Sequence, residues 1–351
     1  MSNVSVSGFR EEVYIDTAGG SYKNVTIANV AACDNGDTGI FVDKSYTWPK
    51  PETTNLTIRS SLTYGNGRWG IQIEGVEGGT VSNSTAYSNG DIGVWSWAAD
   101  RILFEQDVAH GSAGKDGGFD LDVGTTNSTI EYSYSYDNGG SGFQVCNYAY
   151  NPVTANNTIR FNIGENNYGS AAGLELDGDG SRIEGLYYYN NTIYQNLGTG
   201  DYLVGEYTPA SNFIVANNII YAGAADGAAS LWAESPITLD YDDWDGALGA
   251  FWYNDKDDGS YASFRNATGQ EADGLNANPR LAGLPGTENP LAYRLAPGSP
   301  LLRAGADMRK TYDIDPGRRD YYGNLLPLSG PLSMGADAGQ DARRGPIHET
   351  K

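Results

Sequence analysis

Two aspartates in a short alternating stretch, Asp120 and Asp122, have the residue type and spacing to do chemistry. They lie in the segment Gly-Phe-Asp-Leu-Asp-Val-Gly at residues 118–124, where acids alternate with apolar residues. This period of two is typical of a β-strand with one buried face, so both carboxylates should point the same way, about 6.5–7 Å apart. At that spacing two acids can hold a glycosidic bond and a water molecule between them.

The segment belongs to an internal repeat, which predicts the scaffold that positions these acids. Each copy has an Asn-led β-branched run, a polar turn, and then Gly, an aliphatic residue, any residue and a second aliphatic residue. The repeat glycines are Gly39, Gly70, Gly93, Gly118, Gly142 and Gly173, and weaker copies follow near residues 187–204 and 213–231. Successive repeat glycines are 23 to 31 residues apart. Repeats of this length, with short strands and no helix between them, are typical of the coils of a parallel β-helix.

We therefore expect an all-β protein with a parallel β-helix of about eight coils over residues 1–234. Residues 235–351 are rich in proline and turn residues, and they predict a loop-rich C-terminal cap and return segment packed on the helix. Residues 263–274 are expected to form a short helix in this segment.

Asparagine and cysteine fit the same scheme. Six Asn-x-Ser/Thr triplets recur at one point of the repeat, and we interpret them as bends and strand entries rather than as glycosylation acceptors. They begin at Asn24, Asn55, Asn83, Asn127, Asn156 and Asn190. Cys33 and Cys146 fall several coils apart, so no disulfide is expected between them.

The charge of the chain limits its partners. With 44 acidic and 22 basic residues, the formal net charge is -22 and the sequence pI is about 4.3. Such a surface repels nucleic acid and anionic lipid, so neither nucleic acid nor a membrane is expected as a partner. We expect a monomer.

Met1–Phe9 lacks the basic start and apolar stretch of a secretory leader, yet for a chain of this kind we expect a place outside the cell, with the leader removed.

Aligning the copies on their glycine gives two columns of side chains that point out from the coils. The first column is Phe41, Gln72, Trp95, Asp120, Gln144 and Glu175, and the second is Asp43, Glu74, Trp97, Asp122, Cys146 and Asp177. Because coils stack about 4.8 Å apart, Trp95 and Trp97 should lie one coil from the aspartates. Glu175 and Asp177 should lie two coils away on the other side, at about 9.6 Å.

Outward aromatic rings beside outward acids predict a sugar-binding groove, because rings stack on sugar faces and acids handle hydroxyls and protons. The residues expected to contact substrate are Trp95, Trp97, Gln72, Glu74, Gln144 and Tyr148. A catalytic stripe should gather its acids and aromatic rings around coils three to six, whereas a scaffold would distribute them along the helix.

Two chemistries follow from the residues alone. In a glycoside hydrolase, one of Asp120 and Asp122 is the general acid, its pKa raised by its neighbour, and the other is the base; Glu74, Glu175 and Asp177 are reserves. This reaction requires no cofactor. In a lyase on a uronic acid polymer, the acids hold Ca²⁺ against the substrate carboxylate and Lys115 is the candidate base. His110, the one histidine outside the tail, is interpreted as a turn residue.

The whole chain resembles the right-handed parallel β-helix proteins of bacteria, a superfamily rich in polysaccharide lyases, glycoside hydrolases and uronan epimerases. The stretches at residues 263–271, 274–280 and 295–300 are similar to the C-terminal region of many secreted members. Residues 118–122 also resemble part of the Tyr-Gly-Phe-Asp-Pro-His motif of mannuronan epimerases, with Asp120 at the Asp. Gly117 and Asp122 replace the Tyr and the His, so two chemical residues of that motif are absent.

The prediction from sequence is a secreted or cell-surface polysaccharide-degrading enzyme, most simply a glycoside hydrolase that uses Asp120 and Asp122. The alternatives are a Ca²⁺-dependent lyase or an epimerase, and, from another class, a carbohydrate-binding or adhesin-like β-helix without turnover.

Overall fold

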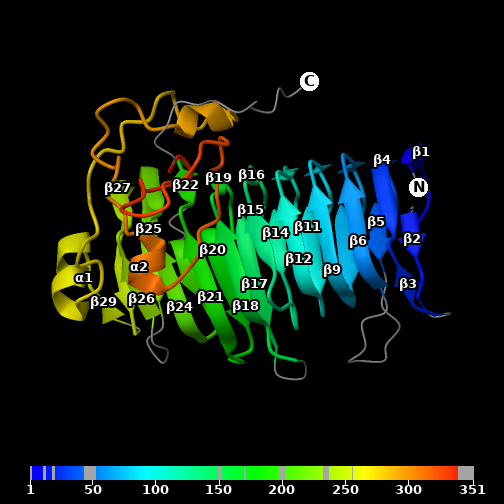
Figure 1. Ribbon diagram of the computed structural model, residues 1–351, viewed down its shortest axis with the longest axis horizontal. Helices are drawn as coiled ribbons and strands as arrows, with labels where there is room; N and C mark the ends of the chain where they lie inside the picture. The colour runs from blue at the N-terminus through cyan, green and yellow to red at the C-terminus, as the bar shows by residue number, and fades with distance from the viewer. Residues whose placement is uncertain are drawn as a thin grey trace.

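The computed structural model describes residues 2–10, 13–17, 20–42, 53–148, 152–169, 171–197, 202–231, 237–254 and 256–338. The chain winds into a parallel β-helix in which three columns of strands run the length of the molecule (Figure 1). The expected all-β architecture of about eight coils is confirmed.

The first column carries the predicted acids. Its strands are β2 (Val13–Ile15), β5 (Ile40–Val42), β8 (Ile71–Glu74), β11 (Val94–Trp97), β14 (Phe119–Leu121), β17 (Phe143–Asn147), β20 (Ala171–Gly178), β23 (Tyr202–Glu206), the end of β25 (Ile219–Leu231) and β28 (Phe251–Tyr253). Neighbouring strands of the column pair in parallel, and β29 (Lys256–Asp257) closes it by an antiparallel pairing with β28.

The other two columns complete each coil. The second column is β3 (Tyr22–Lys23), the start of β4 (Thr26–Cys33), β6 (Thr53–Arg59), β9 (Val76–Ser82), β12 (Asp100–Glu105), β15 (Thr129–Glu131), β18 (Ala155–Arg160), β21 (Ile183–Tyr189), β24 (Ala210–Ala216) and β26 (Ile237–Asp240). The third is β1 (Ser2–Ser7), the end of β4, β7 (Leu62–Tyr64), β10 (Thr85–Tyr87), β13 (Val108–His110), β16 (Tyr134–Tyr136), β19 (Ile163–Glu165), β22 (Thr192–Gln195), the start of β25 and β27 (Asp243–Leu248).

The core is a continuous stack of apolar side chains inside the coils. The aliphatic positions of the repeat are fully buried, and Phe119 and Phe143 stack with ring centroids 5.7 Å apart in successive coils. One coil cannot bury its own apolar face, so each coil is stabilised by the coils above and below it.

Asparagine turns the chain at each coil. All six triplet asparagines adopt a positive φ of 50–58°, a conformation that Asn tolerates better than most residues. They fall at two points of the coil rather than at the one point predicted, because Asn55 and Asn156 lie within β6 and β18 whereas Asn83 and Asn190 directly follow β9 and β21. A second row of asparagines lies inside the coils. Asn66 Oδ1 accepts the backbone and side-chain N–H groups of Asn35, while Asn66 Nδ2 donates to Asn89 Oδ1 at 2.9 Å. These bonds satisfy buried polar groups from coil to coil.

His110 is not a turn residue, contrary to the prediction. It ends β13 and stacks between Tyr87 and Tyr136, with centroid distances of 5.2 and 4.4 Å. Tyr64 extends the stack from the next coil, 4.8 Å from Tyr87. The four rings occupy one register position of the third column, so His110 is one ring of an aromatic ladder.

The C-terminal segment both caps the coils and returns along their outside. Parallel pairing continues past residue 234, because β26 pairs with β24 and β28 pairs with β25. Helix α1 (Tyr261–Thr268) then packs Phe264 on Phe251 at 5.0 Å; it is shorter than predicted because Gly269 ends it in the left-handed conformation.

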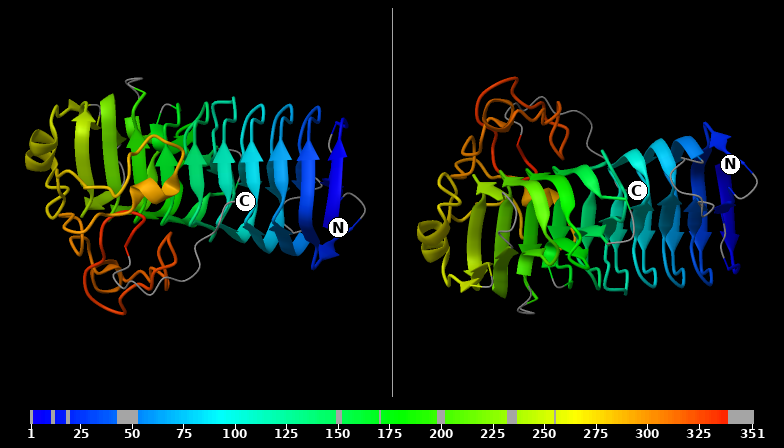
Figure 2. Two further views of the ribbon diagram at one scale, coloured as in Figure 1. Left: turned by 90° about the horizontal axis from the view of Figure 1, so that it is seen from above. Right: turned by 90° about the horizontal axis from the view of Figure 1, so that it is seen from below.

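Beyond α1 the chain turns back, and Figure 2 shows this return segment (orange to red) outside the coils. It contains a short 3₁₀ helix η1 (Pro290–Tyr293) and α2 (Met308–Tyr312), and it buries Phe161, Tyr189 and Ile219 from outside. Cys33 and Cys146 are free and buried, as expected.

A carboxyl pair ends another row of inward asparagines. Asn191 Oδ1 accepts the backbone N–H of Asn162, and Asn218 Oδ1 accepts that of Asn191. In the next coil Asp242 takes this place: its Oδ1 accepts both the backbone and side-chain N–H groups of Asn218. The backbone N–H of Asp242 donates to Glu271 Oε2 at 3.2 Å, and burial raises the pKa of Asp242 to about 7.

We predict that Asp242→Asn removes a pH-dependent loss of stability. Because the folded-state pKa lies above the ordinary value of 3.8, the free energy of unfolding falls as the pH rises from about 4 to about 7. Asparagine keeps the acceptor for Asn218 and adds a donor toward Glu271. The variant should therefore gain several degrees in Tm at about pH 8 and change little at about pH 4, as followed by circular dichroism. Equal shifts at both pH values would contradict the pair as the cause.

Candidate functional site

The predicted columns of side chains are confirmed as a register. In the first column Gln72, Trp95, Asp120, Gln144 and Glu175 pair strand to strand across five coils. In the second, Glu74 pairs with Trp97, and Cys146 pairs with Asp177. Asp43 lies outside the described residues. The sequence period therefore places the acids and rings on one face of the helix.

That face is more covered than predicted. The side chains of the first column are nearly buried, with exposed fractions of 2% for Gln72, 7% for Trp95, 3% for Asp120 and 2% for Gln144. Trp97, Asp122, Tyr148 and Asp177, which lie toward or past the ends of the strands, are half-buried. Solvent therefore reaches the site along the second column.

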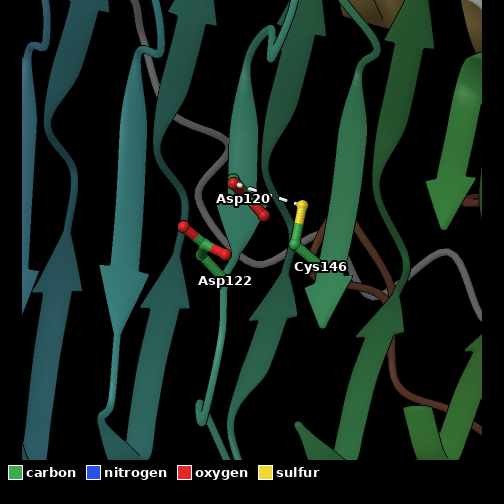
Figure 3. A group of neighbouring side chains, drawn as sticks. All are labelled: Asp120, Asp122 and Cys146. Atoms are coloured by element: carbon green, nitrogen blue, oxygen red, sulfur yellow. Dashed lines mark hydrogen bonds between the residues drawn. The ribbon is translucent and has the colours of Figure 1, made fainter. Parts of the chain in front are cut away.

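Asp120 and Asp122 lie closer together than the predicted 6.5–7 Å. One oxygen of each and the Sγ of Cys146 lie within 4.8 Å of one another (Figure 3). The strand rise does not apply, because β14 ends at Leu121 and the chain turns at Asp122, whose Oδ1 accepts the N–H of Val123 at 2.6 Å. The Cys146 thiol donates to Asp120 Oδ2 at 3.8 Å.

Glu175 and Asp177 lie on β20, and each has a hydroxyl partner. Ser141 Oγ donates to Glu175 Oε2 at 2.9 Å, and the Tyr148 hydroxyl donates to Asp177 Oδ2 at 3.0 Å. The charge of Asp177 raises the pKa of both Asp120 and Asp122, so the two pairs of acids act on one another.

Sequence reasoning missed two further carboxylates, Asp91 and Asp116. Each stands two residues before a repeat glycine, in the turn that leads into β11 or β14. The backbone N–H of Asp116 bonds the Asp91 carboxylate, and the charge of Asp116 acts on Asp120 and Asp122. Their equivalent position in the repeat was the available signal. The site thus contains six carboxyl groups, which we call the acid cluster: Asp91, Asp116, Asp120, Asp122, Glu175 and Asp177.

Burial and mutual repulsion keep protons on the acid cluster. Burial, followed by the charges of Asp122 and Asp116, holds the pKa of Asp120 well above its usual range. Burial is also the main cause that raises the pKa of Asp122 and Asp116 to about 6 and that of Glu175 to about 7. At neutral pH the cluster therefore holds acids in both protonation states.

Gln72, Glu74 and Lys115 were also predicted to belong to the site. Gln72 Nε2 donates to Glu74 Oε1 at 2.6 Å, so these two predicted residues bind one another. Lys115 is exposed, and its positive charge partly offsets the rise in the pKa of Asp116 that burial causes. Lys115 therefore stands beside the acid cluster, and the role of Glu74 as a reserve acid stays a prediction.

Trp95 is not open for stacking on a sugar. Its ring lies 5.1 Å from that of Trp69, a half-buried residue that sequence reasoning did not single out. The Arg68 guanidinium lies over the Trp69 ring, 3.9 Å from its centroid. Trp97, a half-buried residue of the same strand as Trp95, is therefore the better candidate for sugar contacts.

The acid cluster has the ligand chemistry of a cation site. Asp120 Oδ1 is buried without a hydrogen-bond partner, and the other nearby acids also offer oxygen, which Ca²⁺ prefers. Two oxygens that share one Ca²⁺ at about 2.4 Å lie at most about 4.8 Å apart, so the Asp120 and Asp122 oxygens meet this limit. Cys146 is not a Ca²⁺ ligand, because its thiol is soft.

Comparisons with known proteins agree with this architecture. The sequence matches a family described as right handed beta helix region over residues 12–185. The fold is that of a right-handed parallel β-helix. No curated protein matches the sequence at a significant level.

Two solved structures are similar to this right-handed β-helix. One is the A-module of the mannuronan C-5 epimerase AlgE6 of Azotobacter vinelandii, at 19% identity and a TM-score of 0.42, covering 66% of this chain and 64% of that one. The chain thus spans somewhat less than two thirds of the epimerase module. The other is pectate lyase Pel9A, at 16% identity and a TM-score of 0.39, covering 96% of this chain and 70% of that one. In the part of the chain that is described, the helices are too short to cross a membrane.

We predict that Asp120→Asn stabilises the β-helix while it removes a site acid. A buried carboxyl with a raised pKa costs stability increasingly as the pH rises above its ordinary value of 3.8. The variant should therefore unfold at a higher temperature than the wild type at about pH 8 in EDTA, with a smaller difference at about pH 4.

Asp313→Asn is the matched control, because it removes one charge from an exposed position with a positive φ that Asn tolerates. Thermal unfolding followed by circular dichroism gives the Tm of the wild type and of both variants. A lower Tm for Asp120→Asn at about pH 8 would show that the ionised carboxyl is stabilised in the fold.

Proposed function

We propose that the protein is an extracellular enzyme that acts on a polysaccharide, and specifically a glycoside hydrolase that uses Asp120 and Asp122. The observation that carries this proposal is the placement of two carboxyl groups within 4.8 Å of each other in surroundings that raise the pKa of both. Asp120 keeps its proton because it is buried beside other acids, while Asp122, with a pKa of about 6, is mostly ionised at neutral pH. A protonated and an ionised carboxyl side by side are the two groups that glycoside hydrolysis needs.

The concentration of carboxyl groups and tryptophan rings in one part of the β-helix supports an enzyme rather than a scaffold without turnover. Acid-cluster residues from the turns before β11 and β14 and from strands β14 and β20 influence one another electrostatically. Trp69 and Trp95 lie together in the neighbouring coils. A non-catalytic carbohydrate-binding helix has no need for carboxyl groups that repel one another in one place.

The separation of the pair favours one hydrolytic route. Oxygens within 4.8 Å are closer to the roughly 5–5.5 Å of retaining enzymes than to the roughly 6.5–9.5 Å of inverting ones. In this proposal Asp122 attacks the anomeric carbon, Asp120 protonates the leaving oxygen, and water then releases the sugar with Asp120 as base. The first product should keep its anomeric configuration, which proton NMR of the digest measures.

A second candidate is a Ca²⁺-dependent lyase or epimerase on a uronic acid polymer. The partnerless Asp120 oxygen and the excess of carboxylates favour it, because a bound cation would offset their repulsion. Asp120, Asp122 and the neighbouring acids would hold Ca²⁺, which would neutralise a substrate carboxylate. Lys115 is then the candidate base; its exposed ammonium lowers the pKa of Asp116, one of the acids of the cluster.

Digestion of a panel of neutral and uronic polysaccharides, with and without EDTA, separates the candidates. We predict new reducing ends without unsaturated product, insensitive to EDTA, and a loss of about 10²–10⁴-fold in Asp120→Asn and in Asp122→Asn. Asp313→Asn should retain wild-type rates. Unsaturated product that disappears with EDTA would replace the hydrolase with the Ca²⁺-dependent lyase. No product from any polymer would favour a binding protein.

The pH dependence of hydrolysis should report Asp122. Because Asp122 must be ionised to attack, kcat/KM should rise about tenfold per pH unit below a pKa of about 6 and then level. At higher pH it should fall as Asp120 loses its proton. Initial rates on a substrate from the panel give the profile. A profile that is flat from about pH 4 to about pH 7 would exclude Asp122 as the group that must ionise.

A further inference from the structure

The acid pair shares its space with a thiol that the proposed hydrolysis does not use. Cys146 lies on β17, 4% exposed, in register with Asp177 of the next coil. Its Sγ is 3.8 Å from Asp120 Oδ2, and the Asp122 carboxylate completes a triangle of possible ligands within 4.8 Å (Figure 3). Among the described residues, this is the one group of three His, Cys, Asp or Glu side chains whose ligand atoms all lie within 4.8 Å of one another.

An independent observation points to a ligand at this triangle. Asp120 is 97% buried, since its exposed fraction is 3%, and its Oδ1 has no hydrogen-bond partner. A buried carboxyl oxygen without a partner is costly, and most buried polar groups in folded proteins are satisfied. A cation bound between Asp120, Asp122 and Cys146 would supply the missing partner.

We propose that Asp120, Asp122 and Cys146 form a binding site for a thiophilic divalent cation, of which Zn²⁺ is the common example. Zn²⁺ takes thiolate sulfur at about 2.3 Å and carboxylate oxygen at about 2.0–2.2 Å. Two such ligands on a tetrahedral ion lie about 3.4–3.6 Å apart. The Cys146–Asp120 pair is already at 3.8 Å, so binding needs only a small contraction there.

The thiol decides which cation the triangle takes. Thiolate favours Zn²⁺ and similar ions, whereas Ca²⁺ takes oxygen ligands and gains nothing from Cys146. Three protein ligands leave one position of a tetrahedral Zn²⁺ for water. Binding would expel the thiol proton and the proton of Asp120, so the ion competes with protons for the site.

A cation bound at this site would inhibit the proposed hydrolase, because it would occupy both the acid, Asp120, and the nucleophile, Asp122. This consequence rests on the proposed function. The binding site itself does not, and it is tested without any substrate.

The full chain, stripped of metal with EDTA and then freed of chelator, is titrated with Co²⁺ and Zn²⁺. We expect one ion per chain and a thiolate-to-cobalt charge-transfer absorption that Zn²⁺ abolishes. Cys146→Ser should lose that absorption and lose more Zn²⁺ affinity than the roughly 10–100-fold that an outer-shell partner typically contributes. Cys33→Ser is the matched control, because it removes the chain's other buried free thiol, whose Sγ faces the Val6 carbonyl at 4.0 Å.

A second variant keeps the test decisive if Cys146→Ser folds poorly. Asp122→Asn changes a half-buried side chain and keeps the thiol, so it should retain a weakened cobalt absorption and bind Zn²⁺ less tightly. Circular dichroism checks the fold of each variant. Zn²⁺ affinity that is equal in wild type and folded Cys146→Ser, or a wild type without the charge-transfer absorption, would overturn the site. Failure of all polysaccharide digestion would leave these results unchanged and would bear only on the proposed function.

Discussion

The stacking of coils in register, about 4.8 Å apart, is the constraint on which the rest of the structure depends. Every coil must present the same backbone path to its neighbours, so a side chain at one repeat position always meets its equivalents above and below. Inside the coils this produces apolar stacks and asparagine rows that satisfy buried amides. Outside, it forces the carboxyl groups of successive coils together, although like charges repel.

Repulsion among the carboxyl groups of the acid cluster contributes to their raised pKa values and so to the chemistry proposed for the site. The protein pays for the buried carboxyl of Asp120 with stability from the core beneath it, where Phe119 and Leu121 are fully buried on the same strand. Protons or a cation can relieve the repulsion in the acid cluster, and these two possibilities define the proposed hydrolase and its metal-dependent alternatives. The same arrangement, with Cys146 added, gives a softer metal a place to bind.

The fold and the register of the site were predictable from sequence because the repeat is periodic. The glycines fixed the alignment, so the row from Gln72 through Asp120 to Glu175 follows from spacing alone. The separation of Asp120 and Asp122 does not follow from spacing, because it depends on β14 ending at Leu121. Burial of Trp95 was equally invisible, since it results from Trp69 in a turn of the preceding coil.

Turns account for most of what sequence reasoning missed. Asp91 and Asp116 lie in the turns before two repeat glycines, where the strand period says nothing of which way a side chain points, although their equal place in the repeat was a signal. His110 could have been found, because Tyr64, Tyr87 and Tyr136 hold the same repeat position. The return path of the C-terminal segment has no periodic signal, since its contacts with Phe161 and Tyr189 join distant parts of the chain.

The central claim is that Asp120 holds a proton at neutral pH while Asp122 beside it is ionised. Carbon-13 NMR of aspartate carboxyl groups in the EDTA-treated protein, assigned with Asp120→Asn and Asp122→Asn, tests it directly. We predict that Asp122 titrates at about 6 and that the Asp120 signal is still that of the protonated acid at about pH 7. If both carboxyl groups titrate below about pH 5, close to the ordinary range for aspartate, the proposed pair of acid and nucleophile is wrong.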